Sequence, residues 1–374
     1  MSFIGYLVLG YQFNQAINAF VSVLVVACPC ALGLATPLAI VVIEGVCANK
    51  GILVKKSEIL ENAEKINTIV FDKTGTLTYG KLKVSKVINY SDLTDKELLQ
   101  LVASVESKST PPIAKAFEDY EKFEVTEFEN VAGLGIKGIV KEQEIILGNA
   151  KIIKHYNIEN SKQEDEKSLA GEGNSIIYVV QNKKIIAIIG VNDIIRENIA
   201  EVIRKLHKNK IETIMLTGDN KETASIIANK IGITNIIADV VPSQKADIIK
   251  NLKKEGKNVM MCGDGINDSP ALANATIGVS VNSGTDIAMD SSDVILMKNN
   301  LNRILDLINI SKRTIKNIKQ NLFWAFFYNS LMIPVAIGLF HPLGIYINPM
   351  MASFAMVISS LTVILNALRL KRKN

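Results

Sequence analysis

The sequence predicts an α/β protein in which a doubly wound parallel sheet carries an inserted α+β domain and is flanked by transmembrane helices. Strand-like and helix-like segments alternate from residue 185 to residue 262, which is typical of a parallel sheet covered by helices. A region with acidic helical segments and alternating apolar strands, 79–182, separates this pattern from an earlier apolar strand. Long apolar runs lie before residue 49 and after residue 316. The charged body is therefore inserted between membrane segments.

The composition agrees with a membrane protein that has a large polar body. The chain has 374 residues, of which 48% are hydrophobic, and this length permits two or three domains. The 42 basic and 37 acidic residues give a formal net charge of +5, with no single-sign block before the last few residues. This charge pattern gives little support to nucleic-acid binding, so we expect no nucleic-acid partner.

Three apolar runs, at 19–46, 321–340 and 349–368, are long enough to span a membrane. A helix needs roughly 20 apolar residues to cross the hydrocarbon core. The loop at 341–348 has no Lys, Arg, Asp or Glu, whereas basic residues follow the last run. The positive-inside rule then places the C-terminus, and by parity the catalytic body, in the cytoplasm of an integral membrane protein of the cell membrane.

Two of the four cysteines form Cys28-Pro29-Cys30 inside the first apolar run. This spacing is too tight for an ordinary disulfide framework and favours soft-metal ligation. Because Pro29 removes a backbone N–H, we expect an unwound segment that forms a ligand site. The alternative is a kinked helix with two small apolar thiols. We interpret Cys47 and Cys262 as small core residues.

A short β-branched and aromatic run at 66–71 leads directly to Asp72-Lys73-Thr74-Gly75-Thr76. This pattern predicts a buried strand that delivers a carboxylate to the turn at its carboxyl end, where open α/β sheets place their chemistry. A carboxylate can attack a phosphoryl group and hold it as an aspartyl-phosphate. Asp72 is therefore the first candidate nucleophile.

Other polar motifs follow later segments of the same alternating pattern, in which we also assign a strand to 185–191. Thr217-Gly218-Asp219 follows a strand at 212–216, Lys245 opens a helix, and a strand at 258–262 leads to Gly263-Asp264-Gly265-Ile266-Asn267-Asp268. Each motif alone is usually a structural turn. Because the carboxyl ends of parallel strands meet in one crevice, we expect all of these groups to face Asp72.

The residue types in this crevice suit phosphoryl transfer. Asp72 and Asp264 would supply oxygen ligands for Mg²⁺. Lys245 would stabilise the phosphoryl charge, and Thr217 with the N–H groups near Gly218 would hold its oxygens.

Three motifs together are similar to those of a known family: Asp72-Lys73-Thr74-Gly75-Thr76-Leu77-Thr78, Thr217-Gly218-Asp219-Asn220 and Gly263-Asp264-Gly265-Ile266-Asn267-Asp268. They resemble the phosphorylation, hinge and magnesium motifs of the P-type ATPases, whose catalytic domain is similar to haloacid-dehalogenase-like phosphotransferases. Cys28-Pro29-Cys30 and the residues after it, to Pro37, resemble the heavy-metal subfamily, in particular its copper(I) exporters. The resemblance covers essentially the whole chain. It implies ATP-driven export of Cu(I), or Ag(I), with ATP and Mg²⁺ as cofactors.

The resemblance also implies roles for individual residues. Asp72 would be phosphorylated, and Asp264 with the backbone carbonyl of Thr74 would hold Mg²⁺. The other residues of the phosphoryl site would be Lys73, Thr217, Gly218, Asp219, Lys245, Asn267 and Asp268. In the inserted domain, the family's adenine-site acid and glycine motif match Glu106, Gly133 and Gly135. Two glycines at this spacing would also let the backbone approach a flat ligand closely.

The membrane residues that match the copper subfamily are Cys28, Cys30, Tyr328, Asn329, Met356 and Ser360, with Ser359 beside the last. Two thiolates and a thioether favour Cu(I). The two C-terminal spans lack the carboxylate or Lys expected of a Zn²⁺ or Cd²⁺ transporter. The alternative for Met356 is an ordinary packing methionine. Membrane lipid and a soluble metallochaperone that delivers the metal are further expected partners.

The resemblance divides the chain into four parts. Residues 1–48 are a membrane part with the end of one helix and the cysteine-bearing helix, and residues 317–374 are two transmembrane helices with a basic tail. Between them lie a phosphorylation domain, at 49–78 and 183–316, and a nucleotide-binding domain, at 79–182. Pro111 stands where the subfamily has a histidine, so we expect weakened nucleotide binding. No Thr-Gly-Glu occurs in the sequence, although the family's actuator domain uses that loop to hydrolyse the aspartyl-phosphate. The chain thus resembles a carboxyl-terminal portion without the actuator domain, and we expect it to form the phosphoenzyme but turn over poorly.

Two other functions are consistent with Asp72 chemistry. One is a membrane-anchored phosphatase of the haloacid-dehalogenase type, and the other is an inactive fragment. The phosphatase would have no use for Cys28, Cys30, Asn329 and Met356, so the intramembrane ligand set separates it from a transporter.

Overall fold

The computed structural model describes residues 2–8, 10–109, 112–131, 134–219, 221–264, 268–281, 290–297, 300–340, 343–344 and 347–373. The chain forms two compact units. One consists of residues 1–66 and 293–374, and the other of residues 67–292. The apolar runs of the sequence fall in the first unit, and the motifs around Asp72, Thr217 and Asp264 fall in the second.

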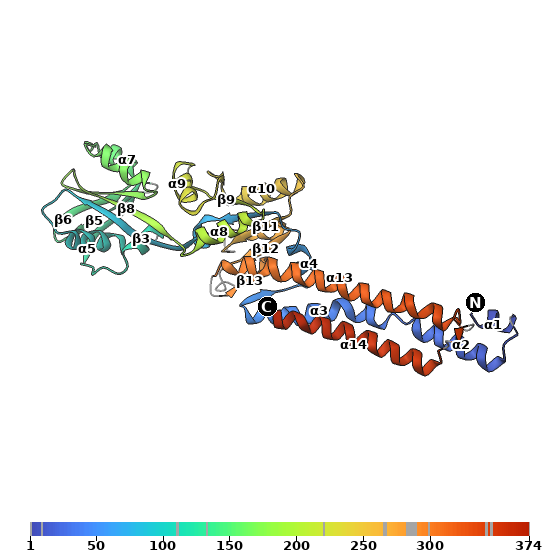
Figure 1. The fold of residues 1–374 in the computed structure, drawn as a ribbon. Helices are drawn as coiled ribbons and strands as arrows, with labels where there is room; N and C mark the ends of the chain where they lie inside the picture. Colours follow the sequence, from blue (N-terminus) through green and yellow to red (C-terminus); the bar gives the residue numbers. More distant parts are fainter. Residues whose placement is uncertain are drawn as a thin grey trace. The chain divides into compact units, whose positions relative to one another are not determined.

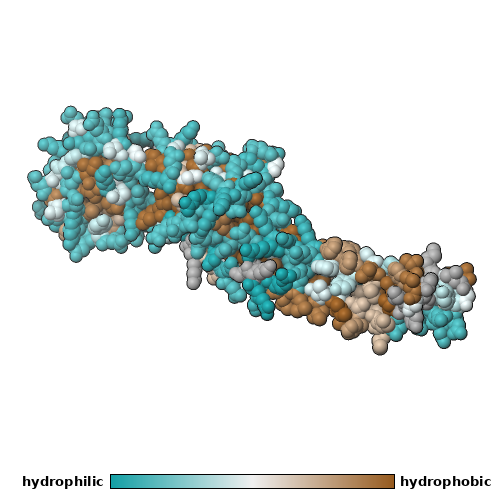
Figure 2. Space-filling view, viewed as in Figure 1, coloured by the Kyte–Doolittle hydropathy of each residue, from teal (hydrophilic) through white to brown (hydrophobic). Residues whose placement is uncertain are grey.

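The first unit is a bundle of helices (Figure 1). Its helices are α1 (Ser2–Val8), α2 (Phe13–Val26), α3 (Cys30–Asn49), α4 (Glu58–Ala63), α13 (Asn302–Ala336) and α14 (Pro349–Lys373). Two segments, Phe13–Asn49 and Pro349–Arg372, are long and apolar enough to cross a membrane. Figure 2 shows apolar residues gathered over these helices. The third expected span, 321–340, falls on the end of α13 and the turn after it, and it stays a prediction.

The expected break at Pro29 is confirmed. Helix α2 ends at Val26 and α3 begins at Cys30, so the residues between them are not helical. Pro37 lies within α3 without ending it. Non-helical backbone at membrane depth is tolerated where it packs on protein or forms a site, so the break marks a place of special function or packing.

Three asparagines join α3, α13 and α14 in the bundle. Asn321 Nδ2 donates to the Ala35 carbonyl at 3.5 Å and to Asn317 Oδ1 at 3.2 Å. Asn366 Nδ2 donates to Asn321 Oδ1 at 2.8 Å, and Asn317 Nδ2 donates to the Asn366 carbonyl at 2.8 Å. Interhelical amide bonds of this kind stabilise helix packing in lipid. A strand pair, β1 (Ile52–Val54) and β13 (Val294–Leu296), completes the unit.

The second unit contains the predicted parallel sheet. Its strands, in the order in which they lie side by side, are β12 (Ile277–Ser280), β11 (Val259–Gly263), β2 (Thr68–Asp72), β9 (Glu212–Leu216) and β10 (Asn235–Ile237). Every neighbouring pair is parallel, which confirms the doubly wound class. The connecting helices are α8 (Ile199–Lys208), α9 (Lys221–Ile231), α10 (Pro242–Lys254) and α11 (Ser269–Asn274). All residues of β2 are buried, so this strand forms the centre of the core.

An antiparallel sheet flanked by helices is inserted after β2, as expected (Figure 1). Its strands, in spatial order, are β3 (Thr78–Asn89), β8 (Lys184–Ile195), β7 (Ser175–Gln181), β6 (Gln143–Gly148), β5 (Gly135–Val140) and β4 (Val125–Val131). Helices α5 (Asp95–Glu106), α6 (Ala150–His155) and α7 (Gln163–Gly171) accompany it. A 3₁₀ helix, Pro112–Phe117, follows α5.

One strand assignment is wrong. Residues 185–191 were expected in the parallel sheet, but they belong to β8, which pairs antiparallel with β3 and β7. Asn182 and Lys183 have φ values of 51° and 58°, so they form a tight turn that joins β7 to β8 as a hairpin. Residues 187–191 are buried without a two-residue period. The apolar run therefore resembled a strand of a parallel sheet, and only the turn distinguished it.

We predict that Phe117→Ala destabilises the inserted domain by about 3–5 kcal/mol, the usual cost of removing a buried phenyl ring. The side chain is 1% exposed and packs in the core with Leu98 and Val102. Hydrogen–deuterium exchange of the α5 amides would measure this as a lowered opening free energy. Lys122→Ala removes an exposed side chain from the same region and serves as the control. Equal exchange in the two variants would contradict the prediction.

Candidate functional site

Asp72 lies at the carboxyl end of the central strand β2 and is held by a buried lysine. Its side chain is 5% exposed. Lys245 Nζ, in the first turns of α10, donates to Asp72 Oδ1 at 2.5 Å and to Asp268 Oδ1 at 2.7 Å. Asp268 caps the start of α11 after β11, so the strand ends converge on one ammonium group as the motifs predict.

The charges in this cluster do not cancel. Burial is the largest cause that raises the pKa of Asp72 to about 7, and the neighbouring Asp268 is the next. Lys245 lowers this pKa, and Asp264 raises it further. Burial lowers the pKa of Lys245, but the two carboxylates outweigh it and the net pKa is raised. Lys245 is therefore a stable cation, while Asp72 is a carboxylate that lacks enough positive charge around it.

The motif after β9 faces the loop that follows Asp72. Lys73 Nζ forms an ion pair with Asp219 Oδ2 at 2.6 Å. Thr217 is 2% exposed, and its hydroxyl accepts a hydrogen bond from the Asp219 N–H at 3.1 Å. The structure thus brings Lys73, Thr217 and Asp219 together beside the end of β2, as expected.

A close approach joins the Asp72 loop to Asp264. Gly75 has a φ of +73°, and a Cβ atom added there would lie 3.0 Å from Asp264 Oδ2. Only glycine suits both this conformation and this space. The carboxylate of Asp264 is therefore packed against the loop that begins at Asp72. On β11, a Cβ atom on Gly263 would lie 2.5 Å from Asp268 Oδ2, so this glycine also makes room for a carboxylate.

Sequence reasoning missed two residues that hold this loop. Arg196, just after β8, donates from Nε to the Thr76 carbonyl at 2.6 Å and from Nη2 to the Gly75 carbonyl at 2.7 Å. Asp193 Oδ2 is hydrogen-bonded to the Thr78 hydroxyl, and its Oδ1 accepts from the Lys81 N–H at 3.0 Å. They escaped notice because the hairpin that brings β8 back beside β3 was not recognised.

The residues present fit a magnesium ion. Within the part of the chain that the structure describes, no three His, Cys, Asp or Glu side chains form a metal site by themselves. Mg²⁺ usually takes one or two carboxylates and completes its shell with water and substrate phosphate. Asp264 packs against Gly75 in the loop that follows Asp72. Burial is the main cause of the raised pKa of Asp72, and the charges of Asp268 and Asp264 add to it, so a divalent cation at this place would offset part of the rise.

The inserted domain contains a cavity. It has a volume of about 260 Å³ and is lined by Glu106, Ser109, Gly135, Gly148 and mostly apolar neighbours. Burial raises the pKa of Glu106 to about 7. Among the described residues, neither Glu106 Oε2 nor the Ser109 hydroxyl has a hydrogen-bond partner. An apolar cavity with unpartnered polar atoms suits a flat ligand with polar edges.

Two glycines pack the strands that wall this cavity. Gly135 of β5 pairs with Gly148 of β6, and a Cβ atom on either would collide with a backbone carbonyl, that of Leu147 or Leu134. Gly148 was not predicted as a site residue. It could have been found from its position directly before the helix cap Asn149. Gly133, Pro111 and Asn267, which the sequence analysis named, lie outside the described residues.

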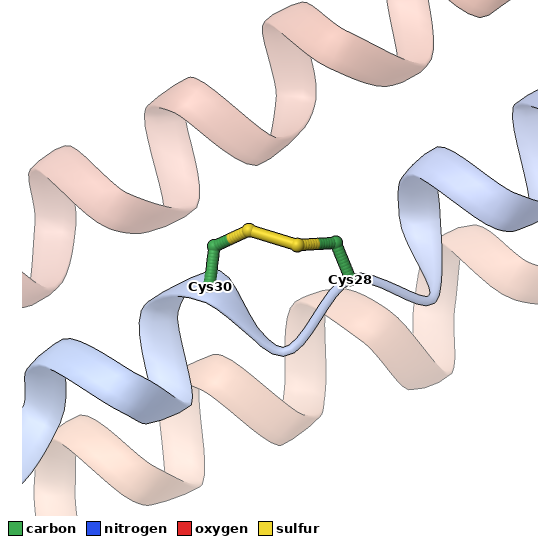
Figure 3. The surroundings of a disulfide bond; sticks show 2 residues. All are labelled: Cys28 and Cys30. Atoms are coloured by element: carbon green, nitrogen blue, oxygen red, sulfur yellow. A yellow bond between two sulfur atoms is a disulfide. The ribbon is translucent and has the colours of Figure 1, made fainter.

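In the membrane unit, the two sulfurs of Cys28 and Cys30 are bonded to each other (Figure 3). The spacing predicted soft-metal ligation and not an ordinary disulfide framework, whereas in the structure the two residues form a disulfide. Pro29 interrupts the helix, so both side chains extend from the same side of one non-helical turn and reach each other (Figure 3). The bonded pair holds no free thiolate, and reduction would release two.

The other expected copper residues lie at the same level of the bundle. On one side of the Pro29 break, Ala31 packs with Ala325 and Val363. On the other side, Val26 packs with Ala336 and Ala352. Each helix therefore carries its candidate residues between these two contacts, namely Cys28 and Cys30, Tyr328 and Asn329, and Met356, Ser359 and Ser360.

Two of these groups lack partners. Asn329 Oδ1 and Ser359 Oγ are buried, and within the described chain neither has a hydrogen bond. Met356 is 7% exposed. Unpartnered polar atoms are costly in an apolar bundle, and a ligand at this level would remove that cost.

A family model described as haloacid dehalogenase-like hydrolase matches residues 66–276. Among solved structures, the chain is 32% identical to the catalytic domain of the CPx-ATPase CopB-B, with a TM-score of 0.56 over 71% of this chain and 98% of that one. The chain belongs to the haloacid dehalogenase-like hydrolases, in the P-type ATPase family. It also matches a zinc-transporting PIB-type ATPase with a TM-score of 0.85 and 29% identity, over 99% of this chain and 60% of that one.

Curated P-type ATPases are more similar in sequence. The chain is 41% identical to a copper-exporting P-type ATPase of Legionella pneumophila, over 100% of this chain and 52% of the relative. It is 42% identical to one of Bacillus subtilis, over 96% of this chain and 45% of the relative. The chain therefore spans about half the length of the curated relatives that it matches.

We predict that Glu106→Gln stabilises this P-type ATPase chain above pH 7 by up to about 3 kcal/mol, with a much smaller effect near pH 4. Burial raises the folded pKa from 4.5 to about 7, so the folded state binds a proton that the unfolded state has released between these values. Stability therefore falls as pH rises across this window, and an uncharged Gln avoids the loss. Urea unfolding at pH 5 and pH 8 would measure it, with exposed Glu118→Gln as the control. The same difference at both pH values would refute the assignment.

Proposed function

We propose that this chain carries the catalytic and metal-binding parts of an ATP-driven exporter of a soft monovalent metal ion, Cu(I), that works through an aspartyl-phosphate. The observation that carries the proposal is Asp72, buried at the end of the central strand and held by Lys245 at 2.5 Å. The names of the copper-exporting relatives support the choice of metal. The catalytic body lies on the cytoplasmic side of the membrane, as the charge distribution predicts.

In the proposed reaction, Asp72 attacks the γ-phosphorus of ATP. A bond forms between a carboxylate oxygen of Asp72 and phosphorus, the bond from phosphorus to the bridging oxygen breaks, and ADP leaves with the electron pair. The ammonium of Lys245 lies on the same carboxylate and offsets the phosphoryl charge. Thr217 and the backbone N–H groups after it would hold the phosphoryl oxygens.

Asp72, Asp264 and the carbonyl of Thr74 would hold the magnesium ion, which when bound neutralises charge on the phosphate oxygens. Lys73 and Asp219 form an ion pair at 2.6 Å, which helps to fix the loop. Arg196 holds two carbonyls of that loop and keeps its backbone in position for the nucleophile. The Asp268 carboxylate keeps Lys245 charged and oriented.

The cavity in the inserted domain would take the adenine ring of ATP. With a pKa of about 7, Glu106 is available near neutral pH both as a proton donor and as an acceptor for the ring edge. The Ser109 hydroxyl provides a second polar contact. Gly135 and Gly148 line the same cavity and let the strands that bound it pack closely. Gly133 and the substitution at Pro111 remain expectations from the sequence.

The metal would bind in the membrane where the helix is interrupted. Reduced Cys28 and Cys30 would supply two thiolates, Met356 a thioether, and Tyr328, Asn329 and Ser360 polar contacts. This soft set suits Cu(I) or Ag(I). The orphaned Asn329 Oδ1 and Ser359 Oγ at this level favour a transporter over a membrane-anchored phosphatase, which would have no use for them. A soluble metallochaperone is the proposed donor of the ion.

We predict that Asp72→Asn abolishes acid-stable labelling of the chain by ATP carrying radioactive γ-phosphate, because an amide oxygen is too poor a nucleophile. Asp247→Asn, which changes an exposed carboxylate on α10, should leave labelling intact. Labelling of the Asp72→Asn variant would overturn the assignment of the nucleophile.

We predict that the chain binds Cu(I) only after reduction of Cys28–Cys30, because a bonded pair has no thiolate. In a competition titration against a chromophoric Cu(I) chelator, Met356→Leu should weaken binding roughly tenfold or more. Met351→Leu, on the same helix but 52% exposed, is the control. Equal affinity of the two methionine variants would remove Met356 from the ligand set.

A further inference from the structure

A basic cavity lies between α13 and α14, away from the metal residues. Its volume is about 430 Å³, and its cations are Arg313, Lys316 and Arg369. The amides of Asn317, Gln320 and Asn366 also line it. No acidic side chain is among the described residues around it. None of these residues belongs to the phosphoryl, nucleotide or metal sites.

The cavity lies where the polar surface of the helices becomes apolar. On α13, the exposed cations Arg313, Lys316 and Lys319 precede exposed Phe323 and Trp324. On α14, exposed leucines, the last of them Leu368, precede the basic end of the helix. Figure 2 shows the hydrophilic surface giving way to an apolar one along these helices. Lysine, arginine and tryptophan at such a boundary mark the headgroup level of a bilayer.

The floor of the cavity is part of the asparagine network. Asn317 and Asn366 are bonded to each other and, through Asn321, to the backbone of α3. A ligand in the cavity would therefore contact the residues that set the packing of three helices. Basic pockets between membrane helices on the cytoplasmic side suit phosphate-bearing lipid headgroups.

We propose that this cavity binds the phosphate headgroup of an anionic phospholipid from the cytoplasmic leaflet. Arg313, Lys316 and Arg369 pair with the phosphate, and the amides of the floor donate to its remaining oxygens. The acyl chains lie along the exposed apolar faces of α13 and α14. The lipid is then a specific ligand that braces the bundle, in addition to being its solvent.

The single tryptophan of the chain provides the test. Trp324 lines a neighbouring hollow that shares Lys316 and Gln320 with the basic cavity. The full 374-residue chain is placed in phosphatidylcholine bilayers that contain dibrominated phosphatidylglycerol or dibrominated phosphatidylcholine. Quenching of Trp324 reports the relative association constant of each lipid. We expect the anionic lipid to be preferred.

Charge-removing pairs give the matched comparison. Arg313→Gln with Arg369→Gln should reduce the preference by about fivefold for each cation removed. Lys371→Gln with Arg372→Gln removes the same charge from the exposed end of α14 and should preserve it. Unchanged quenching by the neutral brominated lipid shows that each variant is folded and inserted.

Three results would overturn the proposed lipid site. Equal quenching by the two lipids in the natural chain, or an equal loss in both variant pairs, would overturn the proposal in favour of diffuse surface charge. Loss of the preference on adding excess inorganic phosphate would show a site for a soluble anion and would also overturn it. None of these measurements depends on ATP or copper, so the outcome is independent of the proposed transport activity.

Discussion

The second unit depends on a buried ammonium group shared by two carboxylates. Lys245 bridges Asp72 and Asp268 at 2.5 and 2.7 Å, and all three side chains are almost inaccessible to water. Burying such charges is costly unless they are paired, so the positions of α10, β2 and α11 are coupled through one contact. The excess negative charge that remains makes the site receptive to cations and to a transferable phosphoryl group once a cation is bound.

The domain inserted after β2 helps to hold the Asp72 loop in place. Strand β3 leaves directly from the Asp72 loop, and β8 returns to Arg196, which holds two carbonyls of the same loop. The antiparallel pair β3 and β8 therefore links the inserted domain to the loop by hydrogen-bonded strands. Because the insertion begins after β2, the central strand stays buried on both faces.

In the membrane unit, polar side chains lie inside an apolar bundle. The asparagine network satisfies its own amides, whereas Asn329 Oδ1 and Ser359 Oγ remain without partners among the described residues. The asparagine network therefore stabilises the bundle, whereas the unpartnered oxygens of Asn329 and Ser359 are available to a ligand. The break at Pro29 lies at the level of the unpartnered groups, and the network lies nearer the charged helix ends.

The sequence alone determined the parallel sheet, the position of Asp72 at a strand end, the break at Pro29 and the family, because these depend on local patterns and short motifs. It could not determine contacts between distant segments. Only the tertiary structure decided that β8 belongs to the inserted sheet, that Arg196 holds the Asp72 loop, and that Cys28 and Cys30 reach each other. The same holds for Gly148 and the basic cavity, whose roles arise where separate strands or helices meet. Periodicity records which face of a segment is buried, and it does not record what that face touches.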